Sequence, residues 1–163
     1  MRNKKVLLIT QAAMIAAIYV VLTCFISAFN LASGAIQVRI SEALTILPVF
    51  TPAAIPGLFL GCLISNLVTG CMPLDVVFGS LATLIGACGT YALRKKKWLA
   101  PIPPIVANMV IVPLVLRYVH MLEGSIPFFM LTVGIGEVIS CYVLGSILLN
   151  VLNKYKTYIF RQS

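Results

Sequence analysis

Long apolar stretches, separated by short breaks that contain polar residues, prolines or glycines, run along this sequence. Residues 6–29 form the first stretch, and the break that follows, residues 30–37, contains Gly34. A helix needs about 20 apolar residues to cross a bilayer. The first stretch is therefore long enough to span, and it is too long for the apolar region of a signal peptide. We expect it to be retained as the first transmembrane helix.

The second apolar stretch, residues 40–69, contains three prolines and is compatible with one kinked span or two short ones. All Lys and Arg residues except Arg39 and Arg117 fall into three clusters, at residues 2–5, 94–97 and 154–161. Basic loops mark the cytoplasmic side of a membrane protein. The three clusters share that side only if residues 40–69 cross twice. We therefore predict two short helices here, joined by a proline-rich cytoplasmic turn.

The apolar pattern as a whole predicts an all-α integral membrane protein with six transmembrane helices. Both termini would lie in the cytoplasm, and residues 1–163 would form a single membrane domain. No internal repeat is visible, which argues against an inverted-repeat transporter. The predicted helices cover residues 6–29, 40–50, 54–69, 74–93, 102–119 and 127–153.

Composition supports a membrane protein and argues against nucleic-acid binding. Hydrophobic residues make up 61% of the chain and charged residues 10%, whereas soluble domains carry about a quarter charged residues. The net charge of +8 sits at the ends of apolar stretches, where topology signals belong. The five cysteines occur singly and there is one histidine, so no zinc-binding spacing can be assembled. We interpret the cysteines as packing residues.

Acidic residues are rare and occupy positions that suggest chemistry. Glu42 begins the predicted helix 40–50, Asp75 begins the helix 74–93, and Glu137 lies within the helix 127–153. An ionisable group inside a bilayer is costly and needs a partner or a wet cavity. Glu137 is thus either a ligand anchor or a paired structural carboxylate. Asp75 is either a ligand contact or an acidic residue whose negative charge is stabilised by the dipole at the helix N-terminus.

A polar stretch at residues 34–48 stands between apolar segments and predicts one wall of a small-molecule site at the outer face. Within it, Arg39 and Glu42 would share a helix face and could pair, which orders the first turn and still leaves donors for a ligand. Asn66 and Asn108 lie in apolar helices, where amides need partners from a neighbouring helix or a ligand. Gln37 is either a ligand contact or a solvated loop residue.

Small residues at helical spacing mark two faces that allow close helix approach. One contains Gly57 and Gly61 on the predicted helix 54–69. The other lies on the first helix, where it predicts internal packing or docking to another membrane protein. Its residues are Ala12, Ala13, Ala16 and Ala17.

Motifs for catalysis are missing from the sequence. It contains no Walker A motif, no Ser–His–Asp set and no metalloprotease motif. We therefore expect no enzymatic activity, no cofactor and no metal. The rival interpretations are a membrane enzyme that uses carboxylates for acid–base chemistry and a ligand-free membrane scaffold. The scaffold predicts that neutral replacements of Glu42, Asp75 and Glu137 leave function intact.

Several blocks carry a family resemblance that covers nearly the whole chain. The most distinctive are GAIQVRISEAL at residues 34–44 and DVVFGSLATL at residues 75–84, supported by AIPGLFLG at 54–61 and Gly136-Glu137. These blocks resemble the QueT-type queuosine-precursor transporters, which are substrate-binding (S) components of bacterial energy-coupling-factor (ECF) importers. The resemblance implies an S-component-like bundle in the bacterial cell membrane that captures a 7-deazaguanine derivative or queuine from outside.

The resemblance also implies partners. A transmembrane coupling subunit and two ATPase subunits would drive release inward by tipping the S component. The alanine face on the first helix looks like the motif by which S components dock to the coupling subunit. Membership does not determine the precursor, and an S component for another vitamin or nucleobase is the alternative.

The chemistry of a deazaguanine matches the candidate residues. Its adjacent N1–H and amino donors suit a carboxylate, so we predict that Glu137 or Glu42 holds this edge. Its carbonyl oxygen suits an amide or Arg39, and a cationic aminomethyl derivative would require a second carboxylate. The predicted substrate-binding residues are Gln37, Arg39, Glu42, Asn66, Asp75, Asn108 and Glu137.

Overall fold

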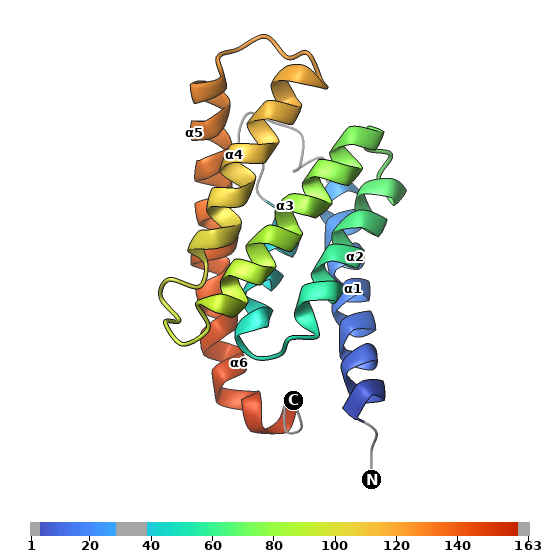
Figure 1. The fold of residues 1–163 in the computed structure, drawn as a ribbon, viewed down its shortest axis with the longest axis vertical. Coiled ribbons are helices and arrows are strands. Elements are labelled where there is room, and N and C mark those ends of the chain that lie inside the picture. The colour runs from blue at the N-terminus through green and yellow to red at the C-terminus, as the bar shows by residue number, and fades with distance from the viewer. Residues whose placement is uncertain (1–3, 29–38, 160–163) are drawn as a thin grey trace.

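The computed structural model describes residues 4–28 and 39–159, which form a bundle of helices (Figure 1). The last three helical segments, α5, η2 and α6, follow one another without a break. In chain order the elements are α1 (Lys4–Ala28), the 3₁₀ helix η1 (Ile40–Val49), α2 (Ala54–Val68), α3 (Pro73–Ala92), α4 (Ile102–Tyr118), α5 (Ile126–Glu137), the π-helical η2 (Val138–Leu144) and α6 (Gly145–Ile159).

The predicted all-helical fold is confirmed for the described residues. Within residues 4–28 and 39–159, three helices are long and apolar enough to cross a membrane: α1, α3 and the continuous helix Ile126–Tyr155. The elements η1, α2 and α4 are apolar but shorter. Glycine and proline breaks account for the ends of several helices, since Pro73 occupies the first turn of α3 and Gly70 has a positive φ of 74°.

Residues 40–49 form a 3₁₀ helix, a detail that the apolar pattern did not predict. Every residue from Ser41 to Pro48 is buried, and η1 packs against α1, α2, α3, α6 and η2. A 3₁₀ helix is more tightly wound than an α-helix and rises about 2 Å per residue. This thin element therefore passes through the centre of the bundle with protein on all sides.

The small-residue faces on α1 and α2 pack against each other. A Cβ added at Gly57 would lie 2.8 Å from the carbonyl oxygen of Ala12, and one at Gly61 would lie 3.1 Å from the Cα of Ala16. The two helices thus approach closely at Ala12 and Ala16, as expected for internal packing. Ala13 and Ala17 are exposed on another side of α1.

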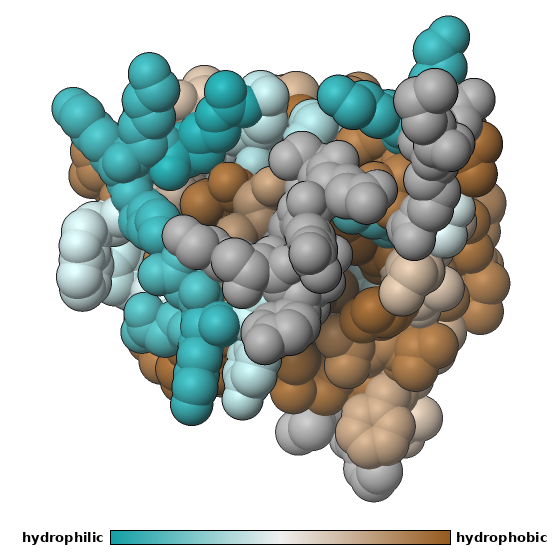
Figure 2. Space-filling view, turned by 90° about the horizontal axis from the view of Figure 1, so that it is seen from below, coloured by the Kyte–Doolittle hydropathy of each residue, from teal (hydrophilic) through white to brown (hydrophobic). Residues whose placement is uncertain are grey.

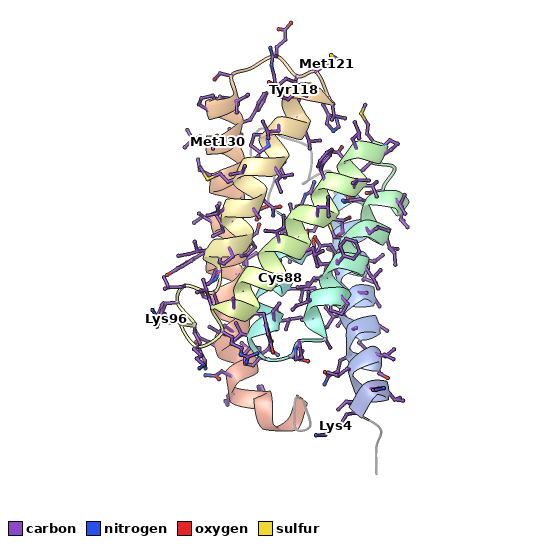
Figure 3. The ribbon with its side chains drawn as sticks, viewed as in Figure 1. Lys4, Cys88, Lys96, Tyr118, Met121 and Met130 are labelled. Atoms are coloured by element: carbon purple, nitrogen blue, oxygen red, sulfur yellow. The ribbon has the colours of Figure 1, made fainter. Side chains whose placement is uncertain are left out.

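Basic residues mark one end of the bundle. Lys4 and Lys96 lie at the lower end, whereas Tyr118 and Met121 lie at the opposite end (Figure 3). The last turns of α6 also reach the lower end (Figure 1). Viewed from this end, hydrophilic residues group along part of the rim, and hydrophobic residues cover much of the remaining surface (Figure 2).

Candidate functional site

Glu42 is buried at the start of η1, with only 2% of its surface exposed. The Tyr19 hydroxyl of α1 donates a hydrogen bond to Glu42 Oε1 at 2.5 Å. Glu42 Oε2 has no hydrogen-bond partner among the described residues. A buried carboxylate oxygen without a donor is unfavourable. The site therefore presents an acceptor that a ligand N–H group would satisfy.

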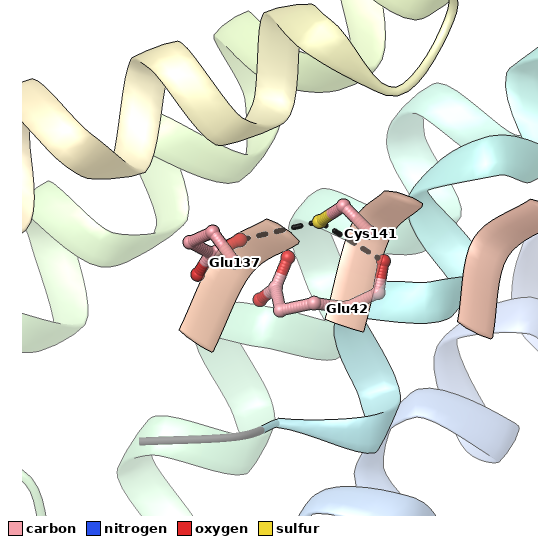
Figure 4. Close-up of side chains that lie close together, drawn as sticks. All are labelled: Glu42, Glu137 and Cys141. Carbon is pink, nitrogen blue, oxygen red and sulfur yellow. Dashed lines mark hydrogen bonds between the residues drawn. The ribbon is translucent and has the colours of Figure 1, made fainter. Parts of the chain in front are cut away.

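Glu137 comes from the last turn of α5 and reaches the same region (Figure 4). The Cys141 thiol donates to Glu137 Oε2 at 3.2 Å and also lies 3.6 Å from the backbone oxygen of Glu42. Ligand atoms of these three side chains all lie within 4.8 Å of one another. Two buried carboxylates thus converge from η1 and the C-terminal helix.

The π-helical segment η2 begins directly after Glu137 and carries Ser140 and Cys141. The Arg39 backbone N–H donates to Ser140 Oγ at 3.1 Å, and Cys141 contacts Thr45 and both glutamates. π-Helical turns are rare and often occur at functional sites. Here the segment connects the entry to η1 with the helix that carries Glu137.

A small cavity of about 20 Å³ lies between the two glutamates. A cavity needs roughly 10–15 Å³ to hold one water molecule, so this inner cavity has room for one small polar group. The inner cavity is lined by Arg39, Glu42, Gly79, Thr83, Asn108, Val112, Val133 and Glu137.

A larger cavity of about 430 Å³ shares Arg39 and Val112 with the inner cavity. Its volume falls in the range of small-molecule sites. Its lining includes the polar side chains of Thr23, Ser41, Asn66, Thr69, Asp75 and His120. We call it the outer cavity because His120 follows α4 at the end of the bundle opposite Lys4 and Lys96.

Asp75 and His120 contact each other in the lining of the outer cavity. Asp75 lies in the first turn of α3, and His120 Nε2 contacts Asp75 Oδ2. The two side chains are 24% and 31% exposed, respectively. The sequence suggested Asp75 as a candidate but not His120. The only signal for His120 was its place in the predicted outer loop 117–127, because its partner lies 45 residues earlier in the chain.

The structure brings six of the seven predicted site residues to these two cavities. Gln37 lies outside the described residues. The helical Arg39–Glu42 salt bridge that the spacing suggested does not form, since Arg39 precedes η1 in an extended conformation (φ −105°, ψ 103°). The predicted site residues that line the inner cavity are Arg39, Glu42, Asn108 and Glu137. Those that line the outer cavity are Arg39, Asn66 and Asp75.

Long apolar helices around buried polar cavities are features of a membrane transport protein. The chain belongs to the QueT transporter family, whose model matches residues 9–154.

A curated relative agrees with this assignment. The chain is similar to the queuosine precursor transporter QueT of Lactococcus lactis subsp. cremoris (strain MG1363), with 35% identity over 85 residues. The match covers 52% of this chain and 50% of the relative, so the chain spans about half the length of the curated relative it matches. No solved structure matches the chain.

Proposed function

We propose that the chain is the substrate-binding component of an ECF importer in the bacterial cytoplasmic membrane and that it captures a queuosine precursor at the outer face. Family membership and the name of the matched relative support the substrate class. The observation that carries the proposal is the unpartnered Oε2 of Glu42 beside Glu137 in the inner cavity.

The donor-rich edge of a 7-deazaguanine suits this pair of carboxylates. Its N1–H and amino groups are adjacent hydrogen-bond donors, and two carboxylate oxygens can accept hydrogen bonds from them. A ligand that donates to Glu42 Oε2 removes the cost of burying this oxygen without a partner, which is about 1–3 kcal/mol or more. Asn108 and Arg39 line the same cavity and can donate to the ring carbonyl.

The cavities support entry of the substrate from outside. In the proposed orientation, the end that carries Lys4 and Lys96 faces the cytoplasm, in agreement with the positive-inside rule. Six spans then form one multi-pass membrane domain with both termini inside. The outer cavity is lined in part by His120 and Leu122, which belong to the connection after α4 at the opposite end. The short elements η1, α2 and α4 are shielded by the longer helices or tilt within the membrane.

The partners in this proposal are a transmembrane coupling subunit and two ATPase subunits. The exposed Ala13 and Ala17 leave a small-residue surface on α1 for the coupling subunit, while Ala12 and Ala16 pack on α2. Small residues allow close contact between helices in a membrane. A docking face adjacent to the packed face would transmit tipping of the bundle through α1.

An uptake assay tests the proposal. The chain is expressed in bacteria that neither make nor import queuosine precursors, with and without the coupling subunit and ATPases, and uptake of a labelled 7-deazaguanine is measured. We expect uptake only with the full set, and a loss of at least tenfold for Glu42→Gln. Glu123→Gln is the control, because Glu123 is exposed and lines neither cavity. Uptake that is absent with the full set, or that does not depend on it, would contradict the proposal.

A further inference from the structure

The carboxylates in the two cavities form two separate groups. Glu42 and Glu137 line the inner cavity, and Asp75 lines the outer one. We infer that Asp75 and His120 form a second subsite that selects substrates with a cationic substituent, an inference that rests on the proposed function.

The sizes of the cavities determine how a bicyclic ligand can lie. The inner cavity, at about 20 Å³, admits only the amino edge of the ring, while the outer cavity, at about 430 Å³, has room for the rest. If the guanine edge points toward Glu42 and Glu137, the opposite side of the bicycle points into the outer cavity. The substituent at ring position 7 belongs to that side. Asp75 is the carboxylate available to it there.

The charges that line the cavities favour a cation. Three carboxylates, those of Glu42, Asp75 and Glu137, face a single arginine, Arg39, among the described lining residues. His120, which contacts Asp75, is a further titratable side chain at this cavity. An ammonium group on the ligand would lie beside Asp75, the one carboxylate among the described residues that line the outer cavity. A nitrile in the same place would direct its acceptor nitrogen toward the oxygens of Asp75, which is unfavourable.

The contact between His120 and Asp75 shows that this carboxylate can hold a nitrogen donor at the cavity wall. His120 Nε2 occupies one oxygen of Asp75, and both side chains are about a quarter to a third exposed. An ammonium group that enters the outer cavity takes the place of His120. His120 lies just past the end of α4, where its backbone N–H still donates to the Val115 oxygen at 3.2 Å, so its displacement requires only that the side chain rotates.

Binding measurements on purified chain in detergent test the inference with two ligands of one scaffold. These are 7-aminomethyl-7-deazaguanine, which is a cation, and 7-cyano-7-deazaguanine, which is neutral. We expect wild type to bind the cation at least tenfold more tightly. Asp75→Asn should weaken binding of the cation by about 10- to 100-fold, the range for a lost charge-assisted hydrogen bond. Binding of the nitrile should change less than about twofold.

Three further variants separate the subsite from a purely structural tie between α3 and α4. Asp75→Glu should keep a preference for the cation, and His120→Gln should retain or strengthen cation binding, because a competing partner is removed. Glu123→Gln removes one exposed acid from the same end of the bundle and should leave both affinities unchanged. This control excludes a general effect of surface charge.

The possible results have distinct meanings. The subsite is overturned if Asp75→Asn weakens the binding of both ligands equally, or if the wild-type protein binds the two ligands with equal affinity. Loss of cation binding in His120→Gln as large as in Asp75→Asn overturns the displacement of His120. A folded wild type that binds neither ligand contradicts the proposed function itself.

Discussion

Replacing Tyr19 by phenylalanine removes the hydrogen bond that its hydroxyl donates to the Glu42 carboxylate. Tyr19 is 1% exposed, and its hydroxyl donates to Glu42 Oε1. Since Glu42 Oε2 already lacks a partner within hydrogen-bonding distance, Tyr19→Phe leaves the carboxylate without its closest donor, and Asn108 and Arg39 remain as its polar neighbours. The ring is otherwise unchanged, so the variant creates almost no cavity.

The expected loss of stability follows from this geometry. A hydrogen bond to a charged group contributes about 1.5–3 kcal/mol. We therefore expect Tyr19→Phe to lower the stability of the purified protein by about this amount, and to lower its thermal denaturation midpoint by several degrees. A deazaguanine that donates to Glu42 should stabilise the variant at saturating concentration, because binding to the folded state raises its stability.

The assay is thermal denaturation in detergent, followed by tryptophan fluorescence or by aggregation. Tyr118→Phe is the matched control, since Tyr118 is 67% exposed and loses the same hydroxyl. A double-mutant cycle with Glu42→Gln isolates the pairwise energy between the two side chains. The reasoning is refuted if Tyr19→Phe is as harmless as Tyr118→Phe, or if the cycle shows no coupling.

Two other predictions concern the packing of α2 on α1 and the exposed face of α1. Gly61→Ala should destabilise the fold by about 1–3 kcal/mol, because the new Cβ would lie 2.8 Å from Tyr19 Cβ. Gly145→Ala is the control, since its Cβ would meet only ordinary contacts at 3.7 Å and the change should be neutral or stabilising. Thermal denaturation compares the stability of the two variants. Ala17→Leu should leave ligand binding intact but reduce co-purification with the coupling subunit at least fivefold, relative to Ala92→Leu on exposed α3 surface. Equal co-purification of these two variants would remove Ala17 from the docking face.

Helix positions could be predicted from the sequence because long apolar stretches and proline or glycine breaks determine them locally. The predicted helix at 74–93 corresponds to α3 at Pro73–Ala92, and the one at 102–119 corresponds to α4 at Ile102–Tyr118. The positive-inside rule was also needed, since hydrophobicity alone did not divide residues 40–69 into two elements.

The winding of individual segments could not be predicted, because it depends on tertiary packing. The residues of η1 form a 3₁₀ helix with protein on all sides, and their apolar sequence does not distinguish this from an α-helix. The π-helical Val138–Leu144 likewise reads as ordinary apolar helix. The 3₁₀ helix η1 borders the inner cavity through Glu42, and η2 begins directly after Glu137, so irregular backbone lies next to both candidate carboxylates.

The candidate site could be predicted in part, from the cost of placing polar residues in apolar helices. This reasoning pointed to Glu42, Asn108 and Glu137, which line one cavity. It did not find Tyr19 or His120, whose roles depend on contacts across the bundle. Tyr19 lies 23 residues before the carboxylate that it contacts, in a helix that otherwise reads as apolar.

The most direct test of the central claim is calorimetric binding of 7-deazaguanine derivatives to the detergent-purified chain, with Glu137→Gln compared to wild type and riboflavin as an unrelated ligand. The structure predicts saturable binding of a deazaguanine that the substitution weakens at least tenfold, because Glu137 lies beside Glu42 in the inner cavity. Binding of riboflavin in place of any deazaguanine, or no binding by folded wild-type protein, would contradict the assignment of the substrate.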